Sequence, residues 1–86
     1  MSNTSADDPE AKPYVRIKNK YGQEAIGTDH KEALWRAKRL GYDCSPEAKP
    51  DRCNVSVREY RNWWNQRSDK ERSDLLQGHG SQPPPE

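Results

Sequence analysis

The stretch TDHKEALWRAKRLG, residues 28–41, is the clearest helical pattern in this sequence, and the rest of the fold can be built around it. Thr28 or Asp29 can cap the helix by accepting a hydrogen bond from a free backbone N–H. Glu32 stands three residues after Asp29, as in a capping box. Gly41 can supply the left-handed residue that ends the helix. We therefore expect one helix between these two signals.

The two faces of this expected helix differ in chemistry. A narrow stripe of small apolar residues predicts close packing against a sheet or another helix; it comprises Ala33, Leu34, Ala37 and Leu40. Trp35 points the other way and has basic neighbours at helical spacing. Either Trp35 packs under a terminal segment or at the edge of the core, or it is an exposed aromatic that stacks on bases or anchors a protein contact.

The segment before the helix alternates in the way that is typical of a half-buried strand. In YVRIKNK, residues 14–20, Val15 and Ile17 share one face, while the basic residues share the other. Residues 21–23 can turn the chain, and residues 24–27 can return as a second strand. The sequence thus predicts an N-terminal β-hairpin that leads directly into the helix.

The second half of the chain is less clear. Residues 42–54 contain two prolines and predict an ordered loop. The following stretch fits a helix capped by Ser56, near residues 57–66, with its large apolar residues on one side. The alternative is a third strand over residues 54–60. A further short helix is expected after Ser68, which has a glutamate three residues later.

These elements predict a small single domain of the α+β class, covering residues 13–77. In it, a hairpin packs on one central helix and a second, C-terminal helix; the alternative is a β-β-α-β order. Residues 1–12 and the Pro-rich residues 78–86 are expected to be disordered tails. Hydrophobic residues make up only 29% of the chain, so three Trp and four Tyr must supply much of the core.

The charge is unevenly distributed along the chain. All 15 Lys and Arg lie between Lys12 and Arg72, together with nine of the 14 acidic residues, so this span carries a net charge of +6 although the whole chain carries only +1. A basic body with acidic ends is compatible with an anionic partner, nucleic acid first. A solvated surface rich in both signs is the alternative interpretation.

The leading hypothesis is a small non-enzymatic protein that binds nucleic acid, DNA or RNA, through basic residues interleaved with aromatic ones. In this hypothesis the cations neutralise phosphates and the two tryptophans stack on bases. The predicted binding residues are Arg16, Lys18, Lys20, Lys31, Trp35, Lys38, Arg39, Arg58, Arg61, Trp63 and Arg67.

Two other kinds of function remain open. One is a protein-binding inhibitor or adaptor that meets an acidic protein surface, with Trp35 and Trp63 as anchors. In size and style the chain is similar to phage proteins that dock on host RNA polymerase or on a defence complex. The other is a structural component that self-associates through exposed aromatic residues.

The sequence carries no pattern that predicts catalysis. It has no glycine-rich phosphate loop and no recognisable nucleophile–base or acid–base pair, so we expect no enzyme, no cofactor and no small-molecule substrate.

Cys44 and Cys53 can pair, or bind zinc with His30 and His79, but their spacing matches no compact zinc module, and reduced thiols without a metal are expected. No secretory signal or membrane span is visible, which predicts a cytoplasmic protein that does not bind membranes.

Overall fold

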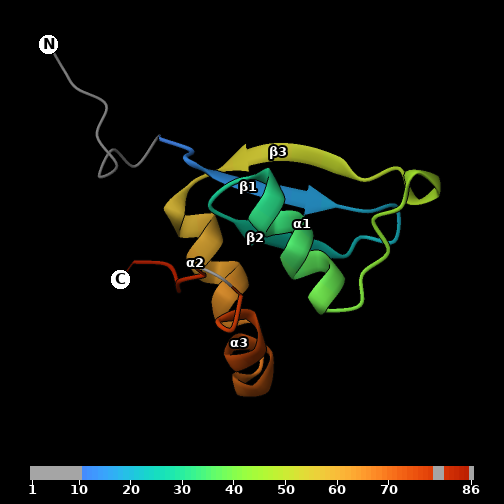
Figure 1. The fold of residues 1–86 in the computed structure, drawn as a ribbon. Coiled ribbons are helices and arrows are strands. Elements are labelled where there is room, and N and C mark those ends of the chain that lie inside the picture. Colours follow the sequence, from blue (N-terminus) through green and yellow to red (C-terminus); the bar gives the residue numbers. More distant parts are fainter. Residues whose placement is uncertain (1–10, 79–80, 86) are drawn as a thin grey trace, which may run out of the picture.

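A computed structural model describes residues 11–78 and 81–85 (Figure 1). Three antiparallel strands form one sheet in the order β2-β1-β3, so β1 lies in the centre. The strands are β1 (Tyr14–Lys18), β2 (Glu24–Gly27) and β3 (Asp51–Val55), and the helices are α1 (His30–Arg39), α2 (Val57–Asn65) and α3 (Asp69–Leu75). The predicted α+β class, its hairpin and its two main helices are confirmed.

The turn of the β1–β2 hairpin is organised by Asn19. Its side-chain oxygen accepts hydrogen bonds from the backbone N–H groups of Tyr21 and Gln23, both at 3.0 Å. Its amide nitrogen donates to the carbonyl oxygen of Asp43 at 2.9 Å. Gly22 adopts a φ of 82°, which few other residues tolerate. Asn19 is buried, so the turn is fixed by a polar side chain that also holds the loop after α1.

The two ends of α1 are those that the sequence predicts. At the start, the side chain of Asp29 accepts a hydrogen bond from the N–H of Glu32 at 2.7 Å. At the end, Gly41 has a φ of 84° and donates to the carbonyl of Lys38, while Tyr42 donates to the carbonyl of Ala37. This pair of bonds is a Schellman motif, which satisfies carbonyls that the end of a helix leaves free.

Close packing of α1 on the sheet depends on Gly27. A Cβ atom placed on Gly27 would lie 2.7 Å from the backbone nitrogen of Ala33. Ala33 is fully buried and clusters with Val15 and Ile17 on one face of β1. The narrow apolar stripe of α1 therefore lies directly against the sheet, as predicted, because both partners present small side chains.

The larger cluster of the core joins both main helices to the sheet. It comprises Ala25, Ile26, Ala37, Val55, Tyr60, Trp63, Trp64 and Leu75. Leu34 and Leu40, expected in the core from the helical pattern, are only half-buried. Both leucines still pack against the core clusters, and Arg36, which is also on α1, has a fully buried side chain.

The prediction that residues 42–54 form only a loop is wrong, because they contain a 3-10 turn and most of a strand. A 3-10 turn at Pro46–Ala48 is followed by Lys49 in the left-handed region, with a φ of 49°, and then by β3. The sequence DRCNV shows no apolar alternation, because β3 is an outer strand on which only Val55 is buried. The alternative β-β-α-β order is present at the start of the domain, but its third strand is Asp51–Val55 and not residues 54–60, since Ser56 caps α2 and the helix begins at Val57.

The last helix and the C-terminal residues pack back on the domain. Ser68 and Glu71 form a complete capping box at the start of α3, and Leu75 is fully buried. Residues 81–85 lie beside α2 (Figure 1), where the carbonyl oxygen of Gln82 accepts a hydrogen bond from the hydroxyl of Tyr60 at 2.9 Å. The domain limits at residues 13 and 77 stay predictions, and residues 1–10 lie outside the described part of the chain. No helix among the described residues is long and apolar enough to cross a lipid bilayer.

Candidate functional site

Arg36 is the most unusual side chain of the structure, because it is 0% exposed in a helix rich in surface cations. Its Nη1 atom donates to the carbonyl oxygen of Ile26 at 2.9 Å and to the hydroxyl of Tyr60 at 2.7 Å. Its Nη2 atom donates to the hydroxyl of Ser81 at 2.8 Å and to the carbonyl oxygen of Gln82 at 3.0 Å. One guanidinium thus connects β2, α2 and the C-terminal residues.

The charge of Arg36 is compensated by its surroundings. A carboxylate oxygen of Glu32, one turn earlier on α1, lies 3.9 Å from Nη2. The guanidinium also lies 5.5 Å from the ring centre of Tyr60 and 5.2 Å from that of Trp64, within the range of cation–π attraction. A buried cation needs such partners, because an isolated charge in the interior is strongly destabilising. Sequence reasoning missed Arg36, since it stands among residues that read as surface cations.

Tyr60 is buried beside this guanidinium and acts as both acceptor and donor. Burial raises the pKa of its phenol above the usual value, although the positive charge of Arg36 opposes that shift. Its ring centre lies 4.7 Å from the ring centre of Tyr14 on β1. Tyr60 therefore keeps its proton at neutral pH and remains a hydrogen-bond donor to Gln82.

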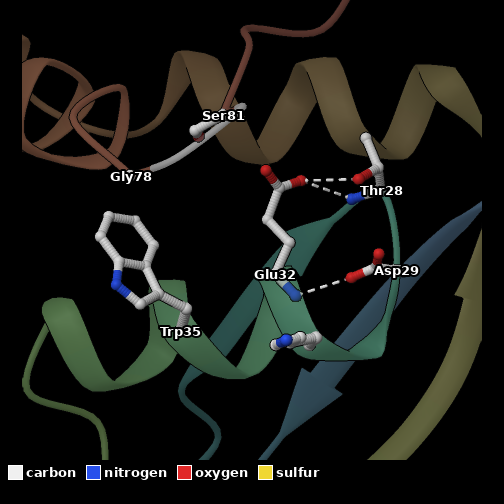
Figure 2. Close-up of a pocket in the computed structure, with 7 residues that line it drawn as sticks. Thr28, Asp29, Glu32, Trp35, Gly78 and Ser81 are labelled. Atoms are coloured by element: carbon white, nitrogen blue, oxygen red, sulfur yellow. Dashed lines mark hydrogen bonds between the residues drawn. The ribbon is translucent and has the colours of Figure 1, made fainter.

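Trp35 packs under the chain after α3, which agrees with the first of its two interpretations. A Cβ atom on Gly78 would lie 2.7 Å from the Cη2 atom of the Trp35 ring, so the backbone at Gly78 rests on the indole. Figure 2 shows the ring pointing from α1 towards Gly78. Trp35 is half-buried as a result.

A cavity of about 340 Å³ adjoins Trp35 (Figure 2) and is also lined by Lys31, Glu32 and Ser81. The carboxylate of Glu32 already accepts hydrogen bonds from the N–H and the hydroxyl of Thr28, at 2.7 and 3.0 Å. It is therefore engaged in capping α1. His79 follows Gly78 in the chain but lies outside the described residues, and we assign no ligand to this cavity.

The structure separates the predicted basic residues of β1 from those of α1. Val15 and Ile17 face α1, so Arg16 and Lys18 project from the opposite face of the sheet, because side chains alternate along a strand. Arg16 pairs there with Glu24 across the hairpin, its Nε atom 3.6 Å from the carboxylate. Arg16 and Lys18 therefore do not belong to the same surface as the cations of α1.

The residues on α2 and just after it that were predicted to bind nucleic acid are largely engaged in packing. Trp63 is 7% exposed, and its indole N–H donates to the carbonyl oxygen of Glu24 at 2.9 Å. Arg67 lies 5.3 Å from the ring centre of Trp63 and donates to the hydroxyl of Tyr42. Arg61 is half-buried and Arg58 is exposed, so Arg58 is the accessible cation of this group, and Trp63 is not available for stacking.

One set of cations does share a side of the molecule. Lys31, Lys38 and Arg39 are exposed on α1. Arg52, which sequence reasoning missed because β3 was expected to be a loop, lies opposite Ile17 and therefore projects to the α1 side of the sheet. We call these four residues the basic surface. Within residues 11–78 and 81–85, none of the four lies in an ion pair.

Lys20 lies apart from the basic surface, at the tip of the hairpin. Its backbone N–H donates to the carbonyl oxygen of Ala48, and its Nζ atom lies 5.3 Å from the ring centre of Tyr21. Tyr21 is 61% exposed, the largest exposed fraction among the bulky hydrophobic residues described.

The two cysteines are free thiols, and both are half-buried. Burial, the largest cause, raises the pKa of Cys44, and the negative charge of Asp43 adds to that effect. No cluster of three or more His, Cys, Asp or Glu suited to a metal occurs in the described ranges, and His79, one of the possible zinc ligands, falls outside them.

Comparison of the chain with models of known protein families, with curated proteins and with solved structures finds no match in any of the three.

Proposed function

We propose that this protein binds nucleic acid through the basic surface formed by Lys31, Lys38, Arg39 and Arg52. The observation that carries this proposal is that these exposed cations lie on one side of the sheet and have no ion-pair partner among the described residues. Cations without a carboxylate partner remain free to neutralise phosphates.

The spacing of the cations on α1 suits a polyanion. Lys31 and Lys38 are seven residues apart on the same side of the helix, which separates them by about 10.5 Å along its axis. B-DNA rises by about 3.4 Å per base pair, so with α1 parallel to the duplex axis the two ammonium groups would be about three phosphate intervals of one strand apart. Arg52 would supply a further contact from β3, the outer strand on the other side of β1.

The binding mode is expected to depend on phosphates and not on base stacking. Trp63 is buried in the core, and Trp35 is partly covered by Gly78. Base stacking requires an accessible aromatic face. We therefore expect weak dependence on sequence and strong dependence on salt, as in other backbone-directed binding.

The test is a titration of fluorescein-labelled single- and double-stranded DNA and RNA at several salt concentrations. The triple variant Lys31→Gln, Lys38→Gln, Arg52→Gln should bind more weakly, and its log–log salt slope for duplex DNA should be shallower by about 0.9 for each phosphate that is no longer neutralised. The matched control, Lys18→Gln, Arg58→Gln, Lys70→Gln, removes the same charge from other surfaces. Equal effects of the two triple variants, or no binding at low salt, would contradict the proposal.

An acidic protein surface is the second candidate partner. It is favoured by Tyr21 at the hairpin tip, where an exposed aromatic ring stands beside the ammonium of Lys20. Aromatic residues are enriched among the anchors of protein interfaces. Polyglutamate that binds more tightly than nucleic acid at equal ionic strength, with binding lost in Tyr21→Ala, would favour this second partner over the first.

A further inference from the structure

The C-terminal residues 81–85, SQPPP, lie beside α2 and are hydrogen-bonded to Tyr60 of α2 and Arg36 of α1. We call residues 81–85 the C-terminal strap. We call the surface beneath them the strap groove; it is formed by the side chains of Arg36, Tyr60, Arg61, Trp64 and Asn65. The carbonyl oxygen of Gln82 accepts two hydrogen bonds, one from the hydroxyl of Tyr60 at 2.9 Å and one from Nη2 of Arg36 at 3.0 Å. Pro84 is buried, and a cavity of about 360 Å³ adjoins it; the residues that line this cavity are Arg61, Trp64, Asn65, Pro83 and Pro84.

The chemistry of the strap groove is that of a site for proline-rich segments. Such segments are extended and have no internal hydrogen bonds, so their carbonyl groups are available to donors from a partner. Domains that bind them use aromatic-lined grooves. Here Tyr60 and Arg36 supply donors for the carbonyl that precedes the prolines, and Trp64 supplies an aromatic wall.

The donors of the groove are held in place by contacts that do not involve the strap. Nη1 of Arg36 bonds to the carbonyl oxygen of Ile26, and the ring of Tyr60 packs on that of Tyr14. A site whose donors are already positioned loses less conformational freedom when a ligand binds. The Nη1 bond of Arg36 and the packing of Tyr60 on Tyr14 would therefore persist if the strap left.

The strap does not fill the groove. The cavity beside the prolines is about 360 Å³ and is open to Asn65 and Arg61. Asn65 is exposed, and Arg61 is half-buried. A ligand longer than the strap has room to reach both side chains.

We propose that the strap groove binds proline-rich segments of another protein, and that the chain's own strap occupies it as an intramolecular substitute. The ligand class is an extended segment in which a polar residue precedes two or three prolines, as Gln82 does here. This binding is independent of the basic surface, which involves other residues.

The strap and the strap groove belong to one chain, and this covalent connection determines how the binding of another peptide would be observed. A ligand joined to its site by a short linker has an effective concentration in the millimolar range. An external peptide therefore binds only the fraction of molecules whose groove is open, and its apparent affinity is reduced by that fraction. Weakening the strap without altering the groove should raise the apparent affinity.

The experiment uses the full chain and a fluorescein-labelled peptide of sequence SQPPP, followed by anisotropy. Pro84→Ser alters the strap but leaves the side chains of α2 unchanged, and it should bind the peptide about tenfold more tightly than the wild-type chain does. The control peptide SQAAA should not bind. In the Pro84→Ser background, Arg61→Ala should weaken binding about fivefold, because it removes a wall of the groove. Arg58→Ala, an exposed cation on the same helix, should have no effect.

Two outcomes would overturn the proposal: no binding of SQPPP to Pro84→Ser, or equal binding of SQAAA. Near-ultraviolet circular dichroism checks that the variant is folded. If it is not, the wild-type chain is titrated with millimolar SQPPP while the indole N–H signals are observed by NMR. A shift of the Trp64 signal with the Trp63 signal unchanged supports the proposal, and unchanged signals for both reject it.

Discussion

The Nη1 atom of Arg36 lies 2.7 Å from the hydroxyl oxygen of Tyr60, although 24 residues separate the two in the chain. The same Nη1 atom donates to the carbonyl oxygen of Ile26 on β2, an outer strand of the sheet. A buried arginine thus joins the two main helices and also occupies part of a strand edge that would otherwise expose free backbone groups.

Replacing Arg36 by Met should destabilise the domain by about 3 kcal/mol or more. Removing one partner of a buried charged network usually has this effect, and the carbonyl of Ile26 would lose its side-chain donor. Urea denaturation followed by circular dichroism measures the change. Arg36→Lys keeps the charge but not the forked donor, and an intermediate loss is expected. A loss below about 1 kcal/mol for Arg36→Met would show that the network contributes little net stability.

Trp63→Phe should cost more stability than Trp64→Phe. Both changes remove part of a largely buried ring, but only the first also removes a donor to the carbonyl oxygen of Glu24. An unsatisfied buried carbonyl costs about 1–3 kcal/mol. Urea midpoints of the two variants test this directly. Equal midpoints would mean that water or another donor replaces the indole at Glu24.

The stability of the domain should fall as the pH rises above about 10, the usual pKa of tyrosine, because burial raises the pKa of Tyr60. A raised pKa means that the unfolded chain loses this proton first, so the stabilisation is complete below the unfolded pKa and is lost as the pH rises towards the folded one. Lysines titrate in the same range, and the comparison with Tyr60→Phe therefore isolates the effect. The variant should be less stable near neutral pH and should show a smaller decline in urea midpoint. A decline equal to that of the wild type would contradict a shifted Tyr60.

Gly78→Ala should change the environment of Trp35, because the new Cβ atom would lie 2.7 Å from the indole ring. The segment must then move off the ring, and tryptophan emission should shift to longer wavelength as Trp35 gains contact with water. Gly22→Ala is the control, since a Cβ at Gly22 meets nothing within 4 Å while its φ of +82° is unfavourable. It should lower stability by about 1 kcal/mol without an emission shift in the folded state. An unchanged spectrum in Gly78→Ala would mean that Gly78 does not cover the ring.

Local chemistry in the sequence determined the hairpin, the limits of α1 and the start of α2 and α3. Asp29, Gly41, Ser56 and Ser68 act on backbone groups within a few residues of themselves, so short sequence patterns suffice to predict them. The strand β3 escaped prediction because an outer strand with one buried residue has no periodic apolar pattern.

The tertiary structure alone decided which charged and aromatic residues are available for binding. Trp63 was a predicted binding residue, and Arg36 stands among predicted surface cations, yet both are buried. Their hydrogen-bond partners Tyr60, Ile26 and Glu24 are distant in sequence, so no local pattern indicates the burial. Arg16 and Arg52 belong to different sides of the sheet only because of strand register, which fixes the face of every side chain. The sequence by itself thus determined the elements and the net charge, whereas the distribution of that charge between surface and interior depends on long-range contacts that no local pattern records.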